Sequence, residues 1–169
     1  MDETKATDRI PGHNHTDVNR QSERELVITR IFDGPAELVF EAWSKPDLFR
    51  RWWVPEGAGL TLLSCEMDAR TGGKYRLVFA HPAAPDGMAF FGTYQEVIPG
   101  KRMVWSNEES GDQGGVTTVV FEERDGRTFV TYSERYQTAE ALEEALAGSA
   151  EGLPEQFRQL DAMLATLSS

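Results

Sequence analysis

Residues 153–167 read LPEQFRQLDAMLATL, and this stretch decides the fold. Its large apolar side chains recur after four, three, four and three residues, at Leu153, Phe157, Leu160, Leu164 and Leu167. That spacing places them on one stripe of an amphipathic helix. Because a proline inside a helix costs about 3 kcal/mol, Pro154 leads us to expect the long helix to begin between residues 149 and 154. The apolar stripe then has to be covered by another layer.

The covering layer is predicted in the preceding segment, where apolar residues follow the two-residue period of β-strands. Turns rich in glycine, proline and aspartate divide this segment. We expect six strands, at residues 60–68, 74–81, 88–98, 101–107, 116–123 and 128–136. Short connections favour an antiparallel meander, which has one face to bury. A short helix at residues 139–147, capped by Thr138, leads to the long one.

The N-terminal part adds one strand and two short helices. Residues 25–32, ELVITRIF, are rich in β-branched side chains and end in the turn sequence Asp33-Gly34-Pro35. One helix is expected after Pro35 and a second over residues 46–53. We expect residues 1–23, which are mostly polar, to form a disordered tail. Residues 24–169 would then form one domain.

This order of elements predicts an α+β fold, in which a curved antiparallel sheet of about seven strands holds the long C-terminal helix on its concave face. The segments that carry a resemblance are 28–30 (ITR), 35–43 (PAELVFEAW), 51–55 (RWWVP), 72–76 (GGKYR), 91–99 (FGTYQEVIP) and 102–105 (RMVW). On these segments, the chain resembles the helix-grip superfamily, which includes the START lipid-binding domains and the birch-pollen-allergen proteins. Within it, the chain is similar to the family of homologues of the activator of the heat-shock-protein-90 ATPase. The resemblance covers residues 25–167 and implies the fold more specifically than any activity.

In helix-grip proteins the space between sheet and helix often forms a cavity for an apolar ligand. Strand alternation and the helix stripe predict the side chains that line it: Trp53, Met67, Tyr75, Phe79, Trp105, Phe121, Tyr132, Glu134, Phe157 and Asp161. The alternative is that these side chains fill a close-packed core.

Two carboxylates in this set, Glu134 and Asp161, are the candidates for polar chemistry. A carboxylate in an apolar cavity has a raised pKa, and it can act as a general acid or base or bind a ligand by hydrogen bonds. Arg76 is the candidate counter-charge, and the favoured alternative for it is an ion pair on the face of the sheet. Cys65 is expected as a buried thiol in mid-strand.

Composition excludes several classes of protein. The 169 residues hold 17 Lys and Arg against 28 Asp and Glu, a net charge of −11, which disfavours nucleic acid as a partner. One cysteine excludes a disulfide scaffold and a cysteine-rich zinc module. No stretch suits a membrane span or a signal peptide, so we expect a cytoplasmic protein. Because no metal-binding, phosphate-binding or triad motif occurs, we predict no metal, no cofactor and no catalytic residue.

The leading hypothesis is therefore a protein that binds a small hydrophobic molecule. One alternative is an enzyme of the cyclase or hydrolase type that uses a cavity carboxylate. Another, implied by the family name, is a chaperone-associated stress-response protein. The oligomeric state stays open between a monomer and a homodimer.

Overall fold

The computed structural model describes residues 16–54, 59–108, 115–147 and 153–167. In this part of the chain, eight strands form one antiparallel sheet in the order β1-β2-β8-β7-β6-β5-β4-β3. The strands are β1 (Asp17–Arg20), β2 (Glu25–Asp33), β3 (Thr61–Met67), β4 (Lys74–His81), β5 (Ala84–Ile98), β6 (Arg102–Ser106), β7 (Val116–Arg124) and β8 (Arg127–Arg135). The helices are α2 (Ala36–Ser44), α3 (Pro46–Phe49), α4 (Ala139–Ala147) and α5 (Leu153–Leu167).

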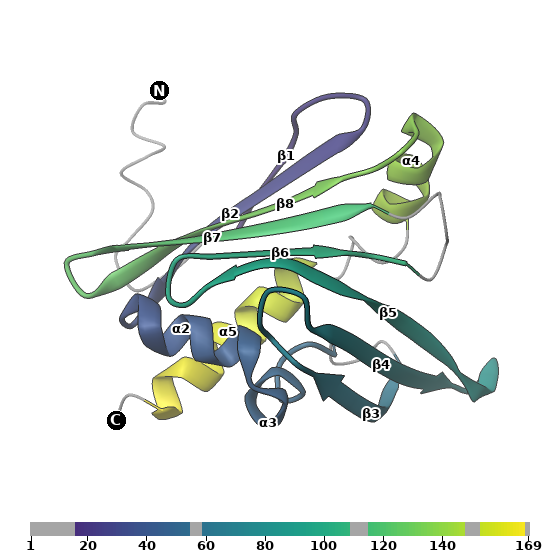
Figure 1. Ribbon diagram of the computed structural model, residues 1–169, viewed down its shortest axis with the longest axis horizontal. Helices are drawn as coiled ribbons and strands as arrows, with labels where there is room; N and C mark the ends of the chain where they lie inside the picture. The colour runs from purple at the N-terminus through teal and green to yellow at the C-terminus, as the bar shows by residue number, and fades with distance from the viewer. Residues whose placement is uncertain (1–15, 55–58, 109–114, 148–152, 168–169) are drawn as a thin grey trace.

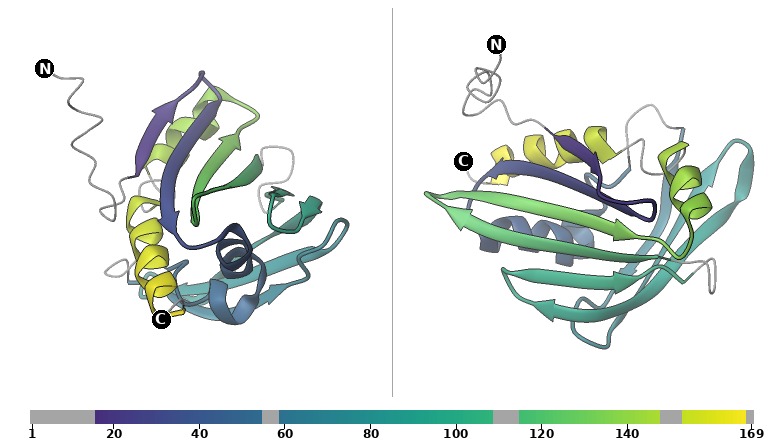
Figure 2. Two further views of the ribbon diagram at one scale, coloured as in Figure 1. Left: turned by 90° about the vertical axis from the view of Figure 1, so that its left-hand side faces the viewer. Right: turned by 90° about the horizontal axis from the view of Figure 1, so that it is seen from above.

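The sheet is strongly curved, and α2 and α5 lie on its concave side (Figures 1 and 2). Helix α5 packs on β2 and α2, while α2 also packs on β7 and β8. Helix α4 stands at the far end of β8, toward the end of the molecule where the β4–β5 hairpin projects (Figure 1). The predicted fold class is confirmed, and α5 begins at Leu153, inside the expected interval.

Strand alternation correctly predicted which side chains point inward. Residues Val119 and Phe121 on β7 and Val130 and Tyr132 on β8 are at most 4% exposed. Residues that pair directly across antiparallel strands share a face, and Val119 pairs with Tyr132 while Phe121 pairs with Val130. The core therefore lies between the concave face and the helices.

The N-terminal prediction is wrong for part of its range. Residues 17–20 form β1, an edge strand that pairs with β2 from Asp17 opposite Thr29 to Arg20 opposite Leu26. Backbone pairing with β2 orders these polar residues although they bury little apolar surface of their own. The remainder of the predicted tail, residues 1–15, lies outside the described residues.

Strand β5 is longer than expected, because it begins at Ala84 rather than at Met88. The β4–β5 pairing continues to His81 opposite Ala84, so much of the predicted loop over residues 82–87 belongs to the hairpin. The second predicted helix is shorter than expected, since α3 ends at Phe49.

Candidate functional site

The interior is built around Trp43, on α2, which is 1% exposed. Its ring lies edge-to-face against the rings of Trp52, at a centroid distance of 4.7 Å, and of Phe157, at 5.8 Å. Trp105, Phe121 and Tyr132 surround it at 5.8–6.2 Å. These distances are those of packed aromatic pairs, so side chains fill the interior where α2 meets α5. The Nε1 atom of Trp43 is buried, and no described group accepts a hydrogen bond from it.

A polar cluster adjoins these rings at the end of β8. Glu134 continues the inward phase of Val130 and Tyr132, as predicted, and its carboxylate accepts a hydrogen bond of 2.7 Å from the Tyr132 hydroxyl. It also accepts one from the Tyr136 hydroxyl. We call Glu134, Tyr132 and Tyr136 the Glu134 cluster. Burial raises the pKa of the Glu134 carboxyl, while the two phenol hydrogen bonds act in the opposite direction. Burial also raises the pKa of both phenols, and the neighbouring carboxylate adds to that rise.

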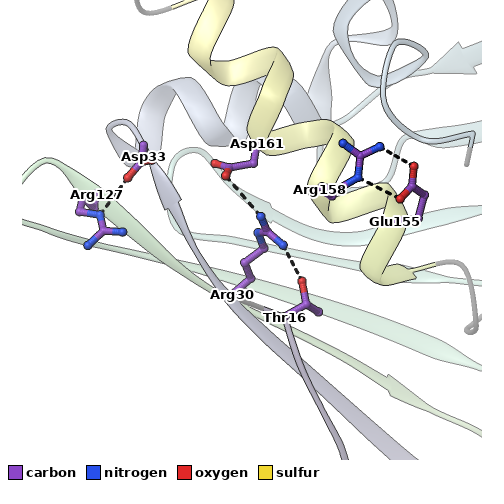
Figure 3. Close-up of polar contacts among 7 residues, drawn as sticks. All are labelled: Thr16, Arg30, Asp33, Arg127, Glu155, Arg158 and Asp161. Carbon is purple, nitrogen blue, oxygen red and sulfur yellow. Dashed lines mark hydrogen bonds and ion pairs between the residues drawn. The ribbon is translucent and has the colours of Figure 1, made fainter. Parts of the chain in front are cut away.

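Asp161 lies elsewhere, in an ion pair that holds α5 on the sheet (Figure 3). Its Oδ2 atom is 3.3 Å from Nη2 of Arg30, on β2. The Arg30 side chain is 7% exposed, and its Nη1 atom donates a 2.8 Å hydrogen bond to Oγ1 of Thr16. The Arg30 guanidinium also lies 5.5 Å from the centre of the Phe32 ring. Asp161 therefore belongs to a structural contact, and the structure does not bring it together with Glu134.

Two glutamines fix the other side of α5. The Gln159 amide donates hydrogen bonds to the backbone oxygens of Trp52, at 3.0 Å, and Val54, at 2.8 Å. The buried Gln156 donates to the backbone oxygen of Trp53. The chain after α3 is thereby tied to α5, beneath the aromatic interior.

The concave face remains partly open toward the β4–β5 hairpin. Met88 and Phe90, on β5, are each 36% exposed. They pair with Phe79 and Leu77 on β4, which are 6% and 5% exposed, so all four lie on the inner face. We call Met88 and Phe90 the β5 lip. Leu62, Cys65 and Met67, on the adjacent inner face of β3, are only partly buried.

The predicted site residues thus divide into four groups. Trp105, Phe121, Tyr132 and Phe157 join the aromatic interior, and Tyr75 borders it through Trp105 at 6.4 Å. Trp53 is partly buried and also contacts Trp43, at 6.2 Å. Phe79, which is buried, and Met67, which is partly buried, lie on the inner face of β4 and β3. Glu134 forms the polar cluster, and Asp161 pairs with Arg30.

Of the two roles considered for Arg76, that of counter-charge to Glu134 is excluded by its position on the sheet. Arg76 is exposed, and its backbone lies opposite that of Glu66 on β3. It alternates with the buried Tyr75 and Leu77, so its side chain lies on the opposite face from the interior. Cys65 is in mid-strand as predicted but only partly buried, and burial raises the pKa of its thiol.

Sequence reasoning missed Trp43 as the centre of the interior and Arg30 as the partner of Asp161. Arg30 carried a usable signal, since it shares the inward phase of Leu26, Ile28 and Phe32 on β2. A charge in an inward phase needs a partner. Nothing in the sequence identified that partner, which lies 131 residues away.

The described residues were also examined for a metal site, a surface groove and a membrane-spanning helix. Within the described residues, no group of three or more His, Cys, Asp and Glu side chains is arranged to hold a metal ion. A surface groove of about 540 Å³ runs between the start of α2 and the β5–β6 turn. One of its lining residues, Glu123, is already engaged, because its carboxylate accepts a 2.9 Å hydrogen bond from the Ala36 backbone N–H. In the described ranges, no helix has the length and apolarity needed to cross a membrane.

A curved antiparallel sheet that holds a C-terminal helix on its concave face defines a helix-grip protein. The family model described as Activator of Hsp90 ATPase homolog 1-like protein matches residues 33–165, and the chain belongs to this family. A comparison with curated proteins found no match.

Solved structures show the same fold. A protein from Rhodobacter sphaeroides has a TM-score of 0.81 and 24% identity, over 90% of this chain and 99% of that one. A protein from Mycobacterium smegmatis has a TM-score of 0.75 and 25% identity, over 90% and 98% of the two chains. A protein of the same family from Aeromonas hydrophila has a TM-score of 0.64 and 22% identity, over 81% and 93%.

Proposed function

We propose that this protein binds a small apolar or aromatic molecule on the concave face of its sheet, between the β5 lip and the Glu134 cluster. The observation that carries the proposal is the exposure of Met88 and Phe90, 36% each, beside the buried Phe79 and Leu77 on the same face. A ligand seated there removes this apolar surface from water, and each Å² so buried contributes about 25 cal/mol.

The chemistry of the surroundings suits such a ligand. The rings of Phe79 and Phe90 meet edge-to-face at 5.5 Å and offer an aromatic contact. Tyr75, Trp105 and Tyr132 continue the aromatic surface toward the Glu134 carboxylate. A largely apolar wall with a few polar groups that orient the ligand is typical of small-molecule sites. Because packed rings fill the interior around Trp43, the binding position that we propose is at the hairpin end and not beneath the middle of α5.

The test uses N-phenyl-1-naphthylamine, a neutral aromatic probe whose emission rises in apolar surroundings. We expect saturable binding to the full chain, weakened several-fold by Phe90→Ser. Phe91→Ser is the matched control, because Phe91 is 39% exposed on the next position of the same strand and faces the other way. Absence of saturable binding, or equal loss in both variants, would contradict the proposal.

An acid–base enzyme is the second candidate, and one observation favours it. Glu134 is an inward-facing carboxyl with a raised pKa, in hydrogen-bond contact with two phenols. Such a group can exchange a proton with a bound substrate. Because Asp161 is engaged with Arg30, this candidate rests on Glu134. Its test is a screen of ester and epoxide hydrolysis in which Glu134→Gln abolishes any turnover that is found.

A further inference from the structure

The negative charge of the Glu134 carboxylate has neutral partners. Its two hydrogen-bond donors are the phenols of Tyr132 and Tyr136. Among the residues that the structure describes, no arginine, lysine or histidine forms an ion pair with it. The adjacent Arg135 is exposed and alternates to the other face, and Arg76 lies on the outer face of β4. An inward-facing carboxylate without a cationic partner is costly and therefore calls for a proton or a positive charge.

The rings beside this carboxylate favour a positive charge. Tyr132 contacts Trp105 at a centroid distance of 6.4 Å, and Trp105 contacts Tyr75 at the same distance. The faces of tyrosine and tryptophan rings carry partial negative charge and attract ammonium groups within about 6 Å. A carboxylate and electron-rich rings together form the usual surroundings of a bound organic cation. Tyr132 is 2% exposed, so the ring surface left for the body of such a molecule is that of Trp105 and Tyr75, at 8% and 9%.

The Glu134 cluster also lies where a ligand can reach it. Glu134 and Tyr136 are only partly buried, in contrast to the fully buried Trp43 and Phe157. The cluster is at the end of β8 that leads into α4, toward the end of the molecule where the β4–β5 hairpin also lies (Figures 1 and 2). A molecule that enters over the β5 lip therefore meets apolar and aromatic side chains first and the carboxylate beyond them.

We propose that the ligand of this site carries a protonated amine on an apolar or aromatic body, with the ammonium group against Glu134 and the body against the neighbouring rings. This inference rests on the proposed binding function and names its ligand class. Binding replaces the missing ionic partner of Glu134 and involves no covalent step.

The experiment compares two molecules of similar shape, 2-phenylethylamine and 2-phenylethanol, by isothermal titration calorimetry with the full chain at neutral pH. We expect the amine to bind about tenfold more tightly, because it adds a charge-assisted contact and a cation–π contact. Glu134→Gln should remove this preference, so that the amine and the alcohol bind with similar affinity. Glu122→Gln, which changes an exposed carboxylate on β7, should keep the preference.

The outcomes separate the inference from the proposed function on which it rests. If the alcohol and the amine bind equally, or if Glu134→Gln retains the preference, the amine inference is overturned and apolar binding stands. If neither molecule binds and the naphthylamine probe also fails, both are overturned. Tyr136→Phe gives a second measurement, since it keeps the charge of Glu134 and removes one donor. In that variant the preference for the amine should persist, and its loss would contradict the assigned role of the carboxylate.

Discussion

At the residue scale, Glu134 couples the stability of the fold to pH. Burial raises the pKa of its carboxyl above the ordinary value of 4.5. The fold therefore favours the protonated form of Glu134. The stabilisation that results is fully present when the pH is below that ordinary pKa. This contribution is lost as pH rises through the raised pKa. Glu134→Gln lacks the titration, and its amide can accept from one phenol and donate to the other.

We expect the melting temperature of Glu134→Gln, relative to that of the natural protein, to rise between about pH 4 and about pH 8. Scanning calorimetry on both proteins in the same buffers measures this difference. The titration of the carboxyls that the two proteins share affects both melting temperatures alike and cancels in the difference. Glu108 and Glu155, whose pKa values are lowered by hydrogen bonds to Ser106 and Arg158, belong to that shared background. A difference that is constant with pH, or that falls, would contradict the assignment.

Gly92 is a residue where the sheet leaves no room for a side chain. A Cβ atom added there would lie 2.8 Å from the carbonyl carbon of Ser106, closer still to its oxygen, and 2.9 Å from Cε2 of Tyr75. We expect Gly92→Ala to lower the free energy of unfolding by about 1–3 kcal/mol, the usual cost of overpacking. Urea denaturation measures it, with Gln95→Ala on the exposed side of β5 as the control. Equal stability of the two variants would show that β5 and β6 can separate without cost.

The sequence predicted the position of a side chain correctly where the alternation of residues along a strand determines which face it lies on. The inward phase of Tyr132 and Glu134 follows from the period of a strand, because it requires no knowledge of the partner strand. The Arg30–Asp161 pair and the central place of Trp43 did not follow. They depend on which helix crosses which strand, and that geometry is set by packing between segments far apart in the chain.

At the element scale, α5 is held by polar contacts on two sides in addition to its apolar stripe. On the sheet side, Asp161→Asn removes the carboxylate from Arg30, which is 7% exposed. Leaving a buried charge without its partner costs about 3–5 kcal/mol, and we expect a loss near the lower limit because Asp161 is 19% exposed. Urea denaturation measures the loss.

The control for that prediction is Asp33→Asn, which removes the more exposed pair between Asp33 and Arg127 (Figure 3). Exposed pairs contribute about 0–1 kcal/mol. The double variant Arg30→Met, Asp161→Leu removes both buried charges and should recover most of the stability that Asp161→Asn loses. Equal costs for Asp161→Asn and Asp33→Asn would mean that the buried pair does not anchor α5.

On the other side of α5, Gln159→Ala leaves the backbone oxygens of Trp52 and Val54 without this donor. A lost partner for a buried carbonyl costs about 1–3 kcal/mol. We also expect faster amide hydrogen exchange around residues 52–54, which distinguishes a loosened segment from general destabilisation. Arg158→Ala is the neighbouring control, since Arg158 is exposed and pairs with Glu155. Unchanged exchange in Gln159→Ala would contradict the anchoring role.

Two elements, β1 and the first part of β5, were not predicted from the sequence. The sequence of β1, DVNR, has no alternating apolar pattern, and its order comes from pairing with β2 and from the Thr16 contact with Arg30. The first part of β5 contains Pro85 and Gly87, and these residue types in a sequence usually indicate a turn. Both elements depend on a neighbouring strand, whereas α5 and the central strands carry their own periodic patterns.

At the scale of the whole molecule, the net charge is −11, and most Asp and Glu side chains in the part of the chain that the structure describes are exposed. Glu140, Glu143 and Glu144 follow one another on the outer side of α4. The ion pairs at the surface, such as that between Arg20 and Glu143 at 2.7 Å, offset only part of this excess. Like charges that are brought together by folding repel one another, and dissolved salt screens them within about 10 Å at 0.1 M.

We therefore expect sodium chloride to stabilise this protein. Between low and physiological ionic strength, a gain of about 1 kcal/mol should raise the melting temperature by roughly 2–4 °C. Glu144→Lys with Asp86→Lys replaces two exposed acidic residues, and each change raises the net charge by two. This variant should melt at a higher temperature than the natural protein at low salt and should respond less to added salt. If its salt response equals that of the natural protein, general salting effects on apolar burial, not charge repulsion, are responsible.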